Sequence, residues 1–166
     1  MNRSASLEDE IAVHRDELLV YAYRLSGDND EAEDIVHTAF MKALQSVRSG
    51  TEAQNLRAWL YRIVHNEALT AQRRVRREAA ALVGLPGAPA PADPARARLL
   101  GKAEREIGRL AEPYRSALRL RYLHHLKYEE AADVLQLSVG TVKSQVARGL
   151  RLLADRMGEA MEGEEA

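Results

Sequence analysis

The sequence predicts an all-α protein with two small helical domains: a three-to-four-helix domain, then a four-helix domain that ends in a helix-turn-helix. Apolar residues recur at spacings of three and four along most of the chain, and no window alternates apolar and polar residues long enough for a strand. Four of the five prolines lie between residues 79 and 98, where they interrupt this pattern. With 166 residues, 46% of them hydrophobic, the chain can build one ordinary domain or two small ones.

Three helices are predicted in the first domain, residues 1–78. The first starts after Ser6, which forms a capping-box pattern with Asp9, and continues to a break at residues 26–29, Ser-Gly-Asp-Asn. The second has acidic residues in its first turn, where the helix dipole favours them, and ends at residues 49–51. Asn55 is the expected N-cap of the third, which continues to an arginine-rich end.

Residues 79–98 are predicted to form an extended linker that joins the two domains. Pro86, Pro89, Pro91 and Pro94 stand here among glycines and alanines. Proline removes a backbone donor and clashes with the preceding turn, so no helix is expected at this density. At about 3.1 Å per residue, such a linker would reach on the order of 50 Å.

The second domain, residues 99–157, is predicted to contain four helices, followed by an acidic tail at residues 158–166. Apolar spacing indicates a helix from Leu99 to Leu110, and Pro113 suits the first turn of the next. A short helix over residues 128–135, YEEAADVL, and a longer one from Val139 are separated by a tight turn. This spacing is typical of a helix-turn-helix.

The outward face of the last predicted helix carries small, hydroxylated and basic residues: Gly140, Thr141, Lys143, Ser144, Arg148 and Arg151. These types suit a helix in the major groove, because lysine and arginine reach purine acceptors or phosphates and hydroxyls add further hydrogen bonds. Arg119 and Arg121, on the preceding helix, are expected to hold the DNA backbone without reading sequence. A helical hairpin whose polar face meets only water is the alternative.

Charge is balanced in total but not along the chain. Residues 8–34 contain ten carboxylates and two arginines, residues 57–78 six arginines and two glutamates, and residues 96–127 nine basic and three acidic residues. A polyanion would bind the basic stretches, so the net charge of −1 is compatible with nucleic-acid binding. Solvated helix faces of mixed charge are the alternative interpretation.

Several function classes are excluded or disfavoured. The absence of cysteine excludes disulfides, cysteine-based metal sites and a cysteine nucleophile. No apolar stretch is long enough to span a bilayer, and the polar N-terminus lacks a signal-peptide core, so we expect a cytoplasmic protein with no membrane insertion. The adjacent His124 and His125 are expected on different faces of a helix, and His37 and His65 stand alone, so no metal or cofactor is expected. No phosphate-binding or nucleophile motif occurs, and we do not expect an enzyme.

Three segments resemble the extracytoplasmic-function (ECF) group of bacterial RNA polymerase sigma factors. Residues 110–153 resemble the promoter-binding fourth region of that group, and residues 22–44 and 55–74 resemble its second region. The stretches DEAEDIV and LRAWLYRIVHN, in this order ahead of a helix-turn-helix, make the match specific. The resemblance implies a subunit that binds core RNA polymerase and directs promoter recognition and transcription initiation.

The resemblance also implies roles for individual residues. It places polymerase docking, on the clamp of the largest subunit, at Glu31, Asp34 and Phe40. It places contacts with the minus-ten element at Asn55, Trp59, Arg62, Asn66, Arg73 and Arg74, with base capture by the loop at residues 46–55. It places contacts with the minus-thirty-five element at Arg119, Arg121, Thr141, Lys143, Ser144, Gln145 and Arg148.

Further partners follow from the resemblance alone: the flap of the second-largest polymerase subunit and an anti-sigma factor, with the linker passing toward the RNA exit path. The sequence departs from the family pattern at Gln145, where arginine is usual, at Ala147, where a larger residue is common, and at Thr70, where aspartate is frequent. The loop at residues 47–55 also lacks the usual aromatic. A sigma-like decoy that occupies an anti-sigma factor and a stand-alone helix-turn-helix regulator remain alternatives.

Overall fold

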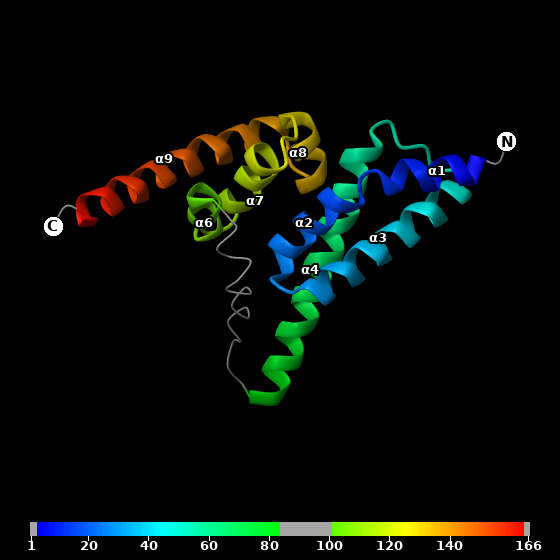
Figure 1. Cartoon of the computed structure of the whole chain (residues 1–166), viewed down its shortest axis with the longest axis horizontal. Helices are drawn as coiled ribbons and strands as arrows, with labels where there is room; N and C mark the ends of the chain where they lie inside the picture. Colours follow the sequence, from blue (N-terminus) through cyan, green and yellow to red (C-terminus); the bar gives the residue numbers. More distant parts are fainter. Residues whose placement is uncertain (1–2, 84–100, 165–166) are drawn as a thin grey trace. The chain divides into compact units, whose positions relative to one another are not determined.

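The structure, a computed structural model, describes residues 3–83 and 101–164, and the helices it contains form two compact units (Figure 1). The chain divides between residues 93 and 94. In the described ranges every regular element is a helix. The predicted all-α fold with two helical domains is confirmed. Most of the predicted linker, residues 84–98, lies outside the described residues.

The first unit contains four helices: α1 (Arg3–Ala12), α2 (Arg15–Ser26), α3 (Asn29–Arg48) and α4 (Leu56–Val83). The prediction of a single helix from Ser6 to the break at residue 26 is wrong, because the chain turns at Val13 and His14. Ser6 lies inside α1 and is not a cap. Helix α1 packs against α3, whereas α2 packs against both α3 and α4. The turn between α1 and α2 leaves Val13 79% exposed.

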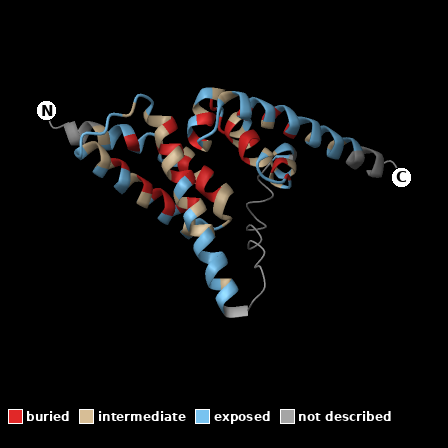
Figure 2. Cartoon of the chain, turned by 180° about the vertical axis from the view of Figure 1, so that it is seen from behind, coloured by how far each residue is buried: buried red, intermediate tan, exposed pale blue. Residues whose placement is uncertain are grey.

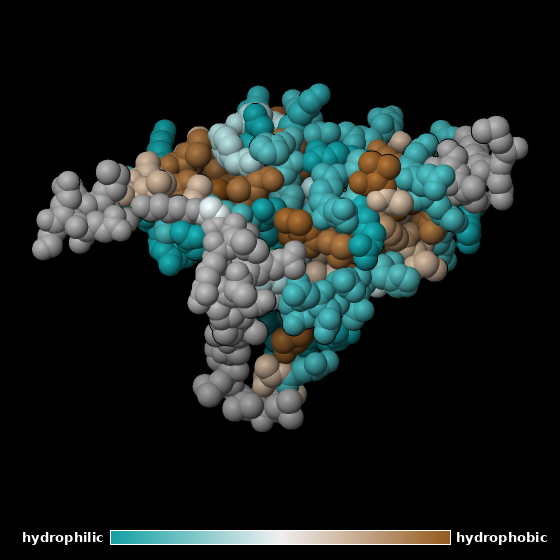
Figure 3. All heavy atoms as spheres, in the orientation of Figure 1, coloured by the Kyte–Doolittle hydropathy of each residue, from teal (hydrophilic) through white to brown (hydrophobic). Residues whose placement is uncertain are grey.

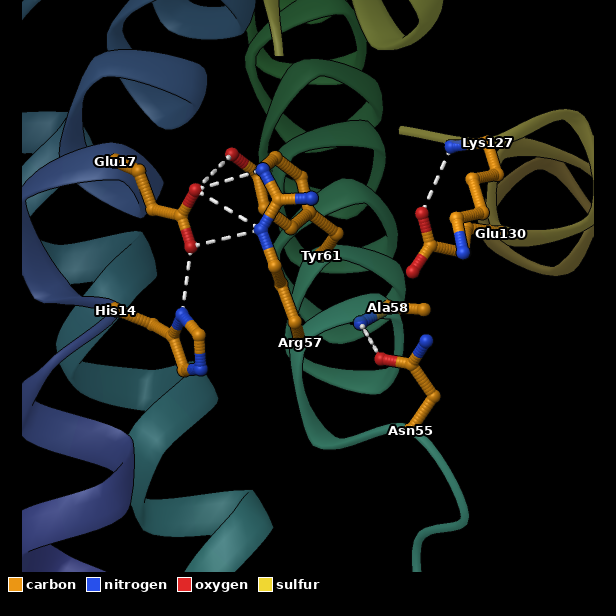
Figure 4. Close-up of polar contacts among 8 residues, drawn as sticks. All are labelled: His14, Glu17, Asn55, Arg57, Ala58, Tyr61, Lys127 and Glu130. Carbon is orange, nitrogen blue, oxygen red and sulfur yellow. Dashed lines mark hydrogen bonds and ion pairs between the residues drawn. The ribbon is translucent and has the colours of Figure 1, made fainter. Parts of the chain in front are cut away.

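The other predicted breaks of the first unit, at residues 26–29 and 49–51, are confirmed. Gly27 ends α2 in the left-handed conformation, at φ 78°, which glycine adopts without steric cost. Asp28 then caps α3 by accepting a hydrogen bond from the backbone N–H of Glu31 at 2.9 Å. Asn55 caps α4 in the same way, accepting from the N–H of Ala58 at 3.0 Å (Figure 4).

An aromatic cluster fills the core of the first unit. The rings of Tyr21 and Tyr61, both fully buried, lie 5.0 Å apart. The hydroxyl of Tyr21 is 2.8 Å from Nδ1 of His65, which is 7% exposed. This hydrogen bond satisfies two polar groups that would otherwise be buried at a cost. His65 therefore has a packing role in the core, as expected for a lone histidine on a helix.

Helix α4 extends beyond the core of its unit. It continues through residues 79–83, which the sequence analysis assigns to the linker, because Ala79, Ala80 and Ala81 are strong helix formers and the first proline is at position 86. Its first half is buried against α2 and α3, whereas its second half is exposed (Figure 2). The 28 residues of α4 span about 42 Å.

The second unit contains α6 (Lys102–Gly108), α7 (Tyr114–Leu118), a π-helical turn η1 (Arg119–Leu123), α8 (Tyr128–Leu135) and α9 (Val139–Glu164). The span predicted for α8 and the start predicted for α9 are confirmed. Helix α6 is shorter than predicted: Leu110 is buried but lies beyond its end, and Ala103 is exposed. Pro113 directly precedes α7. Helix α9 includes residues 158–164, so this part of the predicted acidic tail is helical.

His124 and His125 follow η1 and do not lie on a helix, which corrects the prediction. The π-helical turn ends at Leu123, and His125 has a left-handed backbone with φ 54°. His124 is buried, at 5% exposed, and His125 is exposed. The two side chains therefore differ in environment because the backbone turns between them.

Helices α7 and α9 approach closely at Gly149. A Cβ atom at this position would stand 2.9 Å from Cδ1 of Leu118 and 3.3 Å from Cβ of Tyr114. Leu118 is fully buried, so it has no room to move away. A side chain at position 149 would have to displace Leu118 or push α7 and α9 apart, so glycine allows this close approach.

Candidate nucleic-acid interface

The turn between α8 and α9 fixes the position of α9. Gln136 ends α8 with φ 55°, and the N–H of Leu137 donates to the carbonyl of Ala132 at 3.0 Å. Ser138 then caps α9: its Oγ accepts from the N–H of Thr141 at 3.1 Å and lies 2.8 Å from the Thr141 Oγ1. Buried alanines on α8 and buried valines on α9 close the pair: Ala131, Ala132, Val142 and Val146. The helix-turn-helix is therefore held by backbone, cap and core contacts together.

The opposite side of α9 is exposed, as predicted. The exposed residues are Gly140, Thr141, Lys143, Ser144, Arg148 and Arg151. The Thr141 hydroxyl is already paired with Ser138, so Thr141 belongs to the cap as well as to this face. Gln145 differs from the others: it is half-buried, and its Oε1 is buried without a hydrogen-bond partner. The exposed cations of the face are Lys143, Arg148 and Arg151.

One tyrosine brings together predicted DNA-binding residues from two other elements. Arg121, on η1, places its guanidinium carbon 5.0 Å from the ring centre of Tyr128, the first residue of α8. Lys143, on α9, places its Nζ 5.6 Å from the same ring centre. Arg121 also lies 5.6 Å from the ring of Tyr122. Arg119 is half-buried on the same turn, next to Gly108.

In the first unit, most of the predicted minus-ten residues share one face of α4. At 100° per residue, Asn55, Trp59, Arg62, Asn66 and Arg73 fall within a narrow sector, and Arg74 lies about 100° away. Trp59 and Arg62 are half-buried, and the others are exposed. Arg74 has a distant contact with Glu78, at 3.9 Å. The helix thus aligns aromatic, amide and cationic side chains in one row.

Arg57 does not add to the basic surface of this helix, although it belongs to the arginine-rich stretch at residues 57–78. Glu17 of α2 accepts hydrogen bonds from Arg57 Nη2 at 2.8 Å and from Arg57 Nε at 3.1 Å (Figure 4). Tyr61 also donates to this carboxylate at 3.2 Å, and His14 Nδ1 lies 2.6 Å from it. Arg57 therefore ties α4 to α2, and its charge is neutralised within the protein.

The electrostatics of this cluster favour an ionised Glu17. Burial alone would raise the pKa of the Glu17 carboxyl, but hydrogen bonds from Arg57 and His14 and the charge of Arg57 hold that pKa below its usual value. Burial, and next the charge of Glu17, raise the pKa of Tyr61. Tyr61 therefore stays protonated and serves as a donor to the carboxylate.

The predicted polymerase-docking residues do not form a single face. Glu31 and Asp34 lie one turn apart at the start of α3, and Asp34 is exposed. Phe40 is half-buried and lies six residues further along, which places it about 120° around the helix from Asp34. The acidic first turns of α3 thus form one surface, and Phe40 belongs to a neighbouring one.

Among residues 3–83 and 101–164, no helix has the length and apolar character needed to cross a membrane. In the same part of the chain, no three His, Asp or Glu side chains gather as a metal ion would require.

Comparison with known proteins identifies both units. Residues 11–78 match the family model for Sigma-70 region 2, and residues 100–153 match that for Sigma-70 region 4. The ECF RNA polymerase sigma factor EcfG of Rhodopseudomonas palustris is 32% identical over 86% of this chain and 80% of that protein. This chain belongs to the ECF family of RNA polymerase sigma factors. As such, it binds core RNA polymerase and directs promoter recognition and transcription initiation.

Further relatives of this sigma factor agree. The ECF sigma factor SigW of Bacillus subtilis is 28% identical over 90% of this chain and 87% of that protein. The solved structure of RpoE from Bartonella quintana, in complex with the anti-sigma factor NepR, has a TM-score of 0.73 and 27% identity, covering 92% of this chain and 97% of that chain. CnrH, solved with the cytosolic domain of CnrY, shares the fold at a TM-score of 0.70 and 23% identity.

Sequence reasoning missed three residues that the structure of this sigma factor brings forward. Tyr128 is the only aromatic in the YEEAADVL helix, and its place between two basic segments was an available signal. Gly149 lies inside the long helix α9, and a glycine at such a position generally has a packing reason. Glu17 is a third case, because no local pattern reveals a partner 40 residues away.

Proposed function

We propose that the two units of this sigma factor divide promoter recognition and polymerase binding between their helices. The observation that carries the proposal is the helix-turn-helix of the second unit, whose α9 presents cations on one side while its valines are buried on the other. A rigidly held helix with this polarity fits the major groove of DNA.

In the second unit, Lys143, Ser144 and Arg148 read the minus-thirty-five element. Lysine and arginine are the usual partners of guanine acceptors, and each good bidentate contact is worth about 1–3 kcal/mol of discrimination. Arg119 and Arg121 hold the backbone and set the register. Thr141 acts mainly through the cap with Ser138, and Gln145 contributes least because it is half-buried. The same unit meets the flap of the second-largest polymerase subunit.

In the first unit, the row of side chains on α4 contacts the minus-ten element. Asn66, Arg73 and Arg74 are exposed and can reach phosphates or unpaired bases, and Trp59 offers a partly open ring for stacking. Asn55 is exposed but caps α4, so it acts by fixing the loop at residues 46–55 rather than by direct readout. Arg57 takes no part in DNA binding, because Glu17 neutralises it.

The start of α3 docks on the clamp of the largest polymerase subunit. Asp34 is exposed and carries the main charge, with Glu31 beside it, and Phe40 extends the contact on a neighbouring surface. Such a charged surface speeds association with a basic partner and sets its orientation.

We base the location of the protein, its type of activity and one further partner on its family. We infer a cytoplasmic protein that acts by recognition and not as an enzyme. RpoE was solved with an anti-sigma factor, and we propose that a partner of this kind also sequesters this chain.

Reconstitution with core RNA polymerase tests this proposal. The holoenzyme is used to select initiating sequences from a random DNA pool, and two conserved elements with a fixed spacing are the expected outcome. Binding to an anti-sigma factor without any initiation would identify a decoy instead. Tight binding to one operator in the absence of polymerase would identify a stand-alone regulator.

A further inference from the structure

Two cations of the second unit converge on one aromatic ring. Arg121 from η1 and Lys143 from α9 lie 5.0 Å and 5.6 Å from the ring centre of Tyr128. Both distances are within the range in which a cation is attracted to the face of a tyrosine. Tyr128 is half-buried and is the first residue of α8, so the backbone from which its ring projects belongs to a regular element.

Apart from the Tyr122 ring, which lies 5.6 Å from Arg121, the described residues show no further partner for these two side chains. No ion pair there joins Arg121 or Lys143 to a carboxylate, and the Nε of Arg121 is buried without a hydrogen-bond partner. Two like charges repel, and long basic side chains are mobile when unrestrained. Among the described residues, the ring of Tyr128 is thus the contact that Arg121 and Lys143 share.

We propose that Tyr128 is a positioning residue for upstream promoter reading, which holds Arg121 and Lys143 so that a DNA phosphate and a base edge meet cations already in place. This inference rests on the proposed function of α9. Tyr128 itself does not contact a base in this proposal. A cation that is ordered before binding loses less conformational freedom on binding, and this is the gain that the ring supplies.

The test uses the full chain assembled with core RNA polymerase and a promoter selected by the unaltered protein. Tyr128→Phe keeps the ring, and Tyr128→Leu removes it while preserving an apolar side chain. We expect Tyr128→Phe to initiate within about twofold of the unaltered protein. Tyr128→Leu is expected to lose about 5- to 20-fold, as two exposed cation–π contacts predict. On a promoter with a scrambled upstream element, the three proteins are expected to be equal.

Two further comparisons separate positioning from a general role in folding. In a Lys143→Ala background, Tyr128→Leu should lose clearly less than in the unaltered protein, because the lysine it positions is absent. Tyr122→Leu is a matched control: Tyr122 is 42% exposed and its ring lies 5.6 Å from Arg121, with no lysine contact among the described residues. It should have the smaller effect of the two tyrosine substitutions.

A graded series keeps the test decisive if Tyr128→Leu folds poorly. Phenylalanine with one, two or three ring fluorines at position 128 keeps the shape but weakens the negative face of the ring. Initiation from the intact promoter should fall stepwise along the series. Equal initiation along it, or an equal loss with and without Lys143, would overturn the inference. Failure of the unaltered chain to direct polymerase at all would instead overturn the proposed function.

Discussion

At the scale of single residues, the Glu17 carboxylate joins α2 to α4 in the first unit. It binds Arg57 through three hydrogen bonds and receives a fourth from Tyr61, both on α4. Charge-assisted bonds of this bidentate kind are roughly twice as strong as neutral ones. The contact also decides a functional question, because it removes one arginine from the surface available to DNA.

Glu17→Gln is expected to lower the free energy of unfolding by about 1–3 kcal/mol at pH 7, because an amide cannot replace a charged acceptor. The folded-state pKa of Glu17 lies below its ordinary value of 4.5, so the stabilisation is present above that value and is lost as the pH falls through the folded-state pKa. Urea denaturation of both proteins from pH 7 to pH 3 measures this. Exposed Glu33→Gln is the control, and a gap between the two proteins that stays constant with pH would contradict the account.

At the scale of helices, local sequence signals predict some of the boundaries, whereas packing between helices determines others. The sequence predicts α8 and α9 well, because local signals agree: apolar spacing, a turn and a serine cap. It misses the turn at Val13, because helical periodicity continues across it and only packing on α3 and α4 divides the chain there. It also ends α4 too early, since the change in composition at residue 79 precedes the first proline by seven residues.

Some features of the candidate site could likewise be predicted from the sequence, and others could not. Exposure of Lys143, Ser144 and Arg148 follows from their spacing on one helix and could be predicted. The burial of Gln145 and the neutralisation of Arg57 could not be predicted, because each depends on side chains from another element. The convergence of two cations on Tyr128 joins three elements and has no local signature.

Gly149→Ala tests the contact between α7 and α9. The added methyl group would stand 2.9 Å from Leu118, and overpacking of a buried contact costs about 1–3 kcal/mol. Gly158→Ala is the matched control on the same helix, since a Cβ there meets nothing within 4 Å and alanine favours a helix. Thermal unfolding of the two variants should give a lower midpoint for Gly149→Ala alone. A Gly149→Ala variant as stable as the Gly158→Ala variant would show that α7 and α9 can separate at little cost.

For the whole molecule, the distribution of charge suggests how the sigma factor binds two partners. Exposed carboxylates begin α3, and exposed cations cover the second half of α4 and one side of α9. Hydrophobic atoms also reach the surface along the middle of α9 (Figure 3), where Leu150 and Leu152 are 39% and 38% exposed. The acidic and basic surfaces lie on different helices, so one can be altered without the other.

Asp34→Arg is expected to weaken binding to core RNA polymerase by about tenfold or more while the fold is preserved, because an exposed charge reversal changes stability little. Equilibrium titration of labelled protein with core polymerase measures this. Asp155→Arg, an exposed position in the second unit, makes the same change in net charge and should bind normally. Equal affinity of the two variants would place the docking surface elsewhere.

The most direct test of the division of labour is run-off transcription by core RNA polymerase carrying the Lys143→Ala, Arg148→Ala double variant. The account predicts that this protein still binds polymerase as tightly as the unaltered chain but no longer distinguishes an intact upstream element from a scrambled one, because each lost base contact removes about 1–3 kcal/mol of discrimination. A double variant that keeps full preference for the intact element, or an unaltered chain that initiates from no selected sequence, would contradict it.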